Sequence, residues 1–160
     1  MGMNQWQVTA RMVERFDLDL ILLAGRYTLL DQSALPEFMP LCVERGVRLS
    51  IGGPYNSGIL ATGSKGGPDG VRYDYMEAPP EVVAKVQGLE EAAAKHAVDL
   101  RAAASQFALA HPAVACIVPG TRRPERVLEN LELVRQDIPS AFWDELRDRE
   151  LVRADAPMPA

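Results

Sequence analysis

Two glycine-rich segments of the chain carry polar side chains that could hold a ligand. One reads Gly-Gly-Pro-Tyr-Asn-Ser-Gly-Ile-Leu over 52–60, and the other reads Pro-Gly-Thr-Arg-Arg-Pro-Glu-Arg-Val-Leu-Glu-Asn over 119–130. Glycine lets a backbone approach a ligand closely, and Asn56 and Ser57 add hydrogen-bonding groups. The second segment opens a predicted helix, whose free N–H groups and nearby arginines suit a phosphate. The same arginines could instead form a solvated surface, and the segment alone leaves both interpretations open.

The other reactive residue types do not form a recognisable site. His96 and His111 have no Cys, Asp or Glu at the spacing of metal ligands, so we expect no metal. Cys42 and Cys116 lie in apolar surroundings, which predicts buried free thiols rather than a disulfide framework. The chain has no Walker loop and no Gly-x-Gly-x-x-Gly pattern. We therefore assign no catalytic residue from these motifs.

The elements that would position the two segments follow from the apolar pattern. Short apolar runs predict strands buried on both faces over 18–23, 47–51 and 115–118. Helical spacing predicts helices over 7–16, 33–45, 80–96, 100–110, 125–134 and 140–149. Ser33 and Ser140 are the predicted caps of two of them, Gly46 ends the first, and Pro40 indicates a kink in it or a late start. Strands that alternate with helices indicate parallel βα units.

The composition fits one soluble α/β domain. Of the 160 residues, 48% are apolar and 24% are charged, and the formal net charge is -5. This acidic balance argues against nucleic-acid binding. The chain shows neither an export signal nor an apolar run near the ~20 residues of a membrane helix, so we expect a cytoplasmic protein. We expect a domain over 1–153 and a disordered Pro- and Ala-rich tail over 154–160.

The long segment 52–80 has no predicted secondary structure and is rich in glycine. Loops of this length in compact domains are usually binding loops or lids. The alternative is a flexible surface insertion.

Four motifs in order resemble the aldo-keto reductase family. The segments 117–121 and 126–130 are similar to its last strand-to-helix signature, 27–30 to the segment after its sixth strand, and Pro54 with 58–60 to the loop after its seventh. The segments 23–33 and 56–60 further resemble its aldose 1-dehydrogenase branch. The resemblance implies an α/β fold, a partial (βα)8 TIM barrel. This chain would be its C-terminal half, strands 6–8 with their helices, and residues 2–4 would align with the end of the fifth strand.

By the same resemblance, the chain would carry the cofactor-binding half, for NAD or NADP. It would have none of the family's catalytic Asp, Tyr, Lys and His, which lie on the first four strands. Ala24 and Gly52 stand where many members have a Gln and a Tyr that contact the nicotinamide, and Gly120 where NADP-preferring members often have Lys. The implied cofactor contacts are Asn4 and Gly52 at the nicotinamide, Pro54, Tyr55 and Asn56 along the pyrophosphate, Gly120, Thr121 and Arg126 at the adenosine phosphate, and Glu129 and Asn130 toward the adenine.

The resemblance therefore implies an NAD(P)-dependent oxidoreductase that oxidises an aldose, such as L-fucose or D-arabinose, at C1. Its partners would be the dinucleotide and the sugar, with no nucleic acid and no membrane. The alternative is a catalytically inactive, truncated half-barrel that binds dinucleotide or only self-associates. Open barrel edges and exposed apolar surface favour such association. A different barrel enzyme with a similar phosphate loop is a third possibility.

Overall fold

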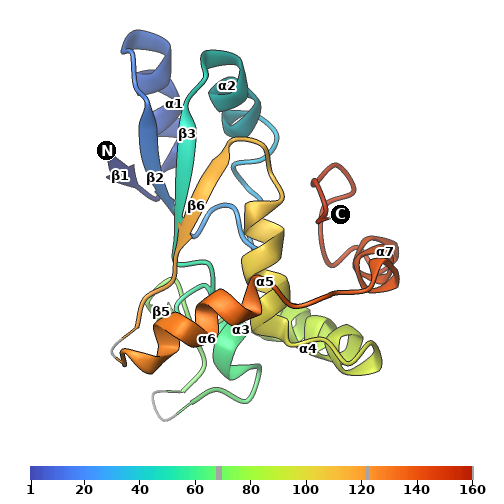
Figure 1. Ribbon diagram of the computed structural model, residues 1–160. Coiled ribbons are helices and arrows are strands. Elements are labelled where there is room, and N and C mark those ends of the chain that lie inside the picture. Colours follow the sequence, from blue (N-terminus) through green and yellow to red (C-terminus); the bar gives the residue numbers. More distant parts are fainter. Residues whose placement is uncertain (68–69, 122, 160) are drawn as a thin grey trace.

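A parallel four-stranded sheet forms the centre of the protein (Figure 1). The computed structural model describes residues 1–67, 70–121 and 123–159, so Arg122, one of the arginines predicted to face an anion, lies outside the described residues. The strand order is β1 (Gly2–Met3), β2 (Leu20–Ala24), β3 (Arg48–Gly52) and β6 (Val114–Val118), and each neighbouring pair is parallel. The three strands predicted from apolar runs are confirmed, but their predicted burial on both faces is wrong for β2 and β6, where alternate residues such as Leu20 and Val118 are exposed. β1 lies where the resemblance placed the end of a further strand.

Helices cover one face of this sheet and leave the other open. Val13, Phe38 and Phe107, from three different helices, share one buried cluster with Ile21 and Leu23 of β2. The alternate residues of β2 face the opposite way, and Leu20 is 52% exposed. The helices are α1 (Trp6–Arg15), α2 (Phe38–Arg45), α3 (Ile59–Thr62), α4 (Pro80–Lys95), α5 (Leu100–Leu109), α6 (Glu125–Leu133) and α7 (Ser140–Asp148).

The two predicted serine caps are wrong, whereas the late start that Pro40 indicated for the first of these helices is confirmed. α2 begins at Phe38 rather than after Ser33, and residues 34–37 form turns. The late start puts Pro40 in the first turn, where its missing N–H costs no helical hydrogen bond. Ser140 is the first helical residue of α7 and makes no cap, because Pro139 occupies the cap position. The predicted stop at Gly46 is confirmed, with its φ of 69° in the left-handed region.

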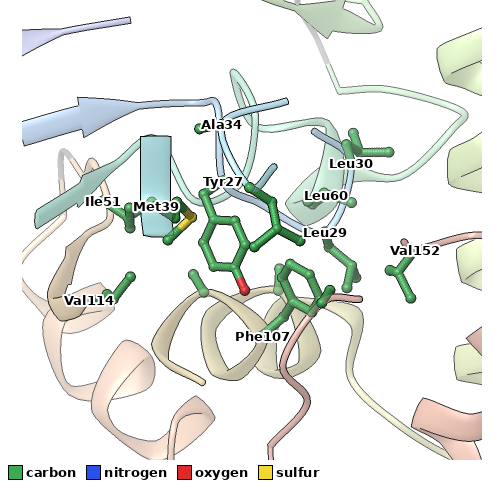
Figure 2. Packing of buried hydrophobic residues seen from close by; sticks show 14 of the residues in the cluster. Tyr27, Leu29, Leu30, Ala34, Met39, Ile51, Leu60, Phe107, Val114 and Val152 are labelled. Atoms are coloured by element: carbon green, nitrogen blue, oxygen red, sulfur yellow. The ribbon is translucent and has the colours of Figure 1, made fainter. Parts of the chain in front are cut away.

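The core centres on Tyr27, which follows β2 and is fully buried (Figure 2). Its ring stacks on Phe107 of α5 at 5.4 Å between centroids. Cys42 lies in the same core, and burial raises the pKa of its thiol to about 12. Cys116, in contrast, is exposed, so its predicted burial is wrong. It pairs in register with Ser50 of β3, on an edge strand of the sheet that no further strand covers.

The segment expected to be an unstructured loop contains three short elements. α3 lies in its first part, and β4 (Arg72–Tyr73) and β5 (Met76–Glu77) pair as an antiparallel hairpin farther on. None of them is long enough to show a periodic apolar pattern. The residues that hold the hairpin in place are also far from it in the sequence, so a local pattern does not predict it.

The segment predicted to be a disordered tail is placed against α7. Ala156 is buried, and its carbonyl accepts a hydrogen bond of 3.2 Å from the Arg147 guanidinium. Met158 packs against the hydrophobic core. Ala156 and Met158 thus make apolar contacts, while Ala154 and Asp155 between α7 and these residues are exposed.

Candidate functional site

A pocket of about 220 Å³ lies where β1, β2 and β3 end. In parallel sheets the carboxyl ends of the strands meet at one edge, which is where α/β proteins bind ligands. The residues that line the pocket come from the strand ends and the loops that follow them: Asn4, Leu22, Ala24, Gly25, Gly52, Gly53, Asn56, Ser57, Asp74 and Tyr75. Three of the residues predicted to contact the cofactor, Asn4, Gly52 and Asn56, therefore lie together.

Asn56 brings an unpaired hydrogen-bond acceptor to this pocket. The residue is only 5% exposed and sits at a φ of 44° in the turn after β3. Its amide nitrogen donates to the Gly25 carbonyl at 3.3 Å, which directs the side chain across the loop after β2. Its Oδ1 is buried and accepts no hydrogen bond from the residues that the structure describes. A ligand that donates an N–H or O–H group there would satisfy this atom.

The β4–β5 hairpin reaches the pocket through ion pairs to the loop after β2. Arg26 binds Asp74 of the hairpin at 2.7 Å and Asp31 at 3.1 Å. Burial alone would lower the pKa of Arg26, but its hydrogen bonds to both carboxylates outweigh burial and raise it. The Tyr73 hydroxyl donates to Asp31 at 3.3 Å, and burial, followed by the Asp31 charge, raises its pKa to about 12. These contacts hold the hairpin over the strand ends.

The other predicted cofactor residues gather around the start of α6. Arg126 pairs with Glu129 at 2.7 Å, and Arg101 of α5 lies 3.9 Å from the same carboxylate. The Tyr55 hydroxyl donates to Asn130 Oδ1 at 3.3 Å and is 3.0 Å from the Ser105 hydroxyl. Tyr55 thus links the loop after β3 to α6.

The predicted residues do not all share one cavity. Thr121 and Asn130 line a second, mainly apolar groove of about 440 Å³ between β6 and α6. Pro54 is buried, and Gly120 is exposed with open space around its Cα. Sequence reasoning missed Asp74 and Tyr75 altogether. The only available signal was the cluster of aromatic and charged residues over 72–77 inside a glycine-rich loop.

The residues present are compatible with a dinucleotide. Gly53 and Gly58 have φ values of 60° and 96°, which let the backbone fold tightly around a ligand. The unpaired Asn56 oxygen offers an acceptor that a ribose hydroxyl or a carboxamide could fill. The titratable side chains among the described lining residues are Asp74 and Tyr75, and the Asp74 carboxylate is paired with Arg26 at 2.7 Å.

The described residues include neither a metal-binding cluster nor a membrane-spanning helix. They contain no cluster of three or more His, Cys, Asp and Glu side chains that could hold a metal ion. Among the helices of this part of the chain, none is both long and apolar enough to cross a bilayer.

Comparison with known proteins gives consistent matches. The model of the Aldo/keto reductase family matches residues 2–149. The chain is 44% identical to pyridoxal 4-dehydrogenase of Microbacterium luteolum over 152 residues, which cover 95% of this chain and 44% of that protein. It is 39% identical to D-threo-aldose 1-dehydrogenase of a Pseudomonas species over 142 residues, which cover 89% of this chain and 43% of that protein.

A solved structure agrees on the fold. The holo form of an aldo-keto reductase from Bacillus halodurans superposes with a TM-score of 0.71 at 23% identity, covering 97% of this chain and 50% of that one. The chain therefore spans about half the length of the proteins that it matches.

Proposed function

The chain belongs to the aldo/keto reductase family, and on this premise we propose that it forms the dinucleotide-binding part of an NAD(P)-dependent dehydrogenase. The observation that carries the proposal is the buried, unpaired Asn56 Oδ1 at the ends of parallel strands. A pyrophosphate has only acceptor oxygens and cannot satisfy this atom. Asn56 Oδ1 therefore accepts from a donor of the cofactor, a ribose hydroxyl or the carboxamide N–H. The amide nitrogen has a second N–H besides the one that it donates to Gly25, and this N–H can donate to the pyrophosphate implied by the resemblance.

The proposed reaction removes hydride from a carbon that bears a hydroxyl group. The two named relatives act on pyridoxal and on D-threo-aldoses, which are both aldehydes that can close to cyclic hemiacetals. With a nicotinamide cofactor bound, oxidation of a hemiacetal would transfer its hydride to that cofactor, release the hydroxyl proton and leave a lactone. The bound cofactor supplies the hydride acceptor. The residues of this chain bind and orient it, with Asn4 and Asn56 nearest the strand ends.

Charge around α6 favours NAD over NADP. Arg126 is already paired with Glu129, and Arg101 also lies near that carboxylate. Glu129 can accept hydrogen bonds from ribose hydroxyls but would repel a 2′-phosphate. We therefore propose NAD as the preferred cofactor.

Titration of the 160-residue chain with NAD⁺ and NADP⁺ tests the proposal. We expect saturable quenching of tryptophan fluorescence, with tighter binding of NAD⁺. Asn56→Gly removes the amide while tolerating the positive φ, and it should weaken NAD⁺ binding about 2- to 10-fold, the effect of one buried hydrogen bond.

Thr62→Ala, at an exposed position on the neighbouring α3, is the matched control and should bind as the unmodified chain does. Equal affinities of Asn56→Gly and the unmodified chain would contradict the assigned role of Asn56. Absence of binding by the folded chain would contradict the proposed function.

The second candidate function is dinucleotide binding without turnover. It is favoured by the ion pair of 2.7 Å between Asp74 and Arg26, which occupies the carboxylate that lines the pocket and would otherwise be a candidate base. Incubation of the chain with NAD⁺ and pyridoxal, L-fucose or D-arabinose, while the absorbance of reduced cofactor is followed, separates the two candidates. Turnover supports the dehydrogenase, and binding without turnover supports the second candidate.

A further inference from the structure

The turn of the β4–β5 hairpin places an aromatic residue in a conformation that aromatic residues avoid. Asp74 and Tyr75 form the two-residue turn, with φ values of 52° and 67°. Two-residue hairpin turns of this kind strongly prefer Asn-Gly or Asp-Gly, because both residues need a positive φ. A bulky residue at such a φ is strained, and strain of this kind concentrates at functional sites.

The strained turn is held in place from two sides. The Asp74 carboxylate pairs with the Arg26 guanidinium at 2.7 Å, and the Tyr75 backbone N–H donates to the Ser57 hydroxyl at 3.0 Å. These contacts connect the hairpin to the loops after β2 and β3. They fix the backbone of Tyr75 beside the pocket without using its side chain.

Tyr75 is one of the residues that line the pocket, and it is 86% exposed, so its ring is free to contact a ligand. The strand ends contribute Leu22, Ala24 and Gly52, which are small or apolar, to the same lining. A Cβ on residue 52 would lie 3.2 Å from Leu22 Cδ2, so a larger residue there would require the Leu22 side chain to move. The pocket therefore combines an exposed aromatic residue with small or apolar residues at the strand ends. Such a lining suits a planar ring.

We propose that Tyr75 contacts the planar ring of the ligand, the nicotinamide, when that ring lies over Gly52. This inference rests on the proposed dinucleotide function. The oxidised nicotinamide ring is cationic, and the face of a phenol ring attracts cations. Tyr75 thus binds the oxidised cofactor in preference to the reduced one. The aromatic ring of this contact comes from the β4–β5 hairpin rather than from a residue at the end of β3.

The test compares NAD⁺, NADH and ADP-ribose, which lacks the nicotinamide, as ligands of the full chain. Tyr75→Gly should weaken NAD⁺ binding about 3- to 10-fold, weaken NADH binding less, and leave ADP-ribose binding unchanged. Tyr75→Phe keeps the ring and should bind NAD⁺ as the unmodified chain does. Met76→Ala, at the exposed neighbouring position of β5, is the matched control and should bind all three ligands normally.

A melting temperature measured for each variant separates binding from folding. Glycine accommodates a φ of 67° without strain, so Tyr75→Gly should melt at the same temperature as the unmodified chain or higher. Unchanged NAD⁺ affinity of Tyr75→Gly would overturn the inference and leave the proposed function standing. An equal loss for NAD⁺ and ADP-ribose would also overturn it, because the hairpin would then act on the whole ligand. A folded, unmodified chain that binds neither ligand would overturn both proposals.

Discussion

At the scale of single residues, side chains near the strand ends are held by partners far away in the sequence. Arg26 joins Asp31 to Asp74, and Asn56 reaches the Gly25 carbonyl. Such contacts pre-orient a site, because little further ordering is required when a ligand binds. A residue of the core, His111, is also held in place by specific contacts. His111 is buried against the Tyr27 ring, and its Nδ1 accepts a hydrogen bond of 3.1 Å from the Ala113 N–H.

The first residue-scale prediction concerns the pH dependence of stability at His111. Burial lowers its pKa below the ordinary 6.5, so the unfolded chain takes up this proton at a higher pH than the folded one. The free energy of unfolding should therefore decrease as the pH falls below about 6.5 and continue to decrease down to the lowered pKa. Chemical denaturation between about pH 8 and pH 5 measures this slope.

His111→Asn is the control for this titration. An Asn side-chain oxygen can accept the same N–H two residues ahead but does not titrate. The variant should show a shallower loss of stability with acidification. If the unmodified chain and the variant lose stability in parallel, His111 is not the group responsible.

At the scale of elements, α5 connects the core to the candidate site. Its Phe107 packs on Tyr27, and its Arg101 and Ser105 lie beside Glu129 and Tyr55. The helix begins at a side-chain cap. Asp99 accepts a hydrogen bond of 2.9 Å from the Arg101 backbone N–H. Hydrogen bonds from the Arg101 guanidinium are the main cause that holds the pKa of the Asp99 carboxyl below its usual range.

Removal of this cap is the element-scale prediction. Asp99→Ala should lower the free energy of unfolding by about 1 kcal/mol, because an N–H at the helix start loses its acceptor. Asp99→Asn retains the acceptor without the charge and should cost only a fraction of that. Thermal or denaturant unfolding measures both variants. A loss as large for Asn as for Ala would indicate that the ion pair with Arg101, and not the cap, stabilises the helix start.

At the scale of the whole molecule, the sheet has one face with exposed apolar residues and two edge strands. Leu20 and Val118 are 52% and 48% exposed on the strands, and β1 and β6 are the outer strands of the sheet. All four strands run in the same direction. A second copy related by a two-fold axis along the barrel would therefore bring β6 beside the partner's β1 in parallel, as an eight-stranded barrel requires.

The molecular-scale prediction is that the 160-residue chain self-associates through this face. Sedimentation equilibrium should give a mass above that of the 17.5 kDa monomer, and the double variant Leu20→Glu with Val118→Glu should shift it to monomer. Val43→Glu, at a position of α2 that is 51% exposed, adds negative charge away from the sheet and should change nothing. A monomeric mass for the unmodified chain at every concentration would refute the prediction.

The sequence by itself determined the alternation of strands and helices, the stop at Gly46 and the family motifs. These features depend on periodic burial and on local backbone preference, which a short window of residues encodes. Only the tertiary structure decided that Tyr75 lies beside Gly52, that Tyr55 meets Asn130 and that Cys116 is exposed. Such placements depend on sheet register and on ion pairs between residues as far apart as Arg26 and Asp74, and no local pattern records them. The short hairpin could not be predicted from the sequence for the same reason, because it is held by contacts with residues far away in the sequence and not by its own composition.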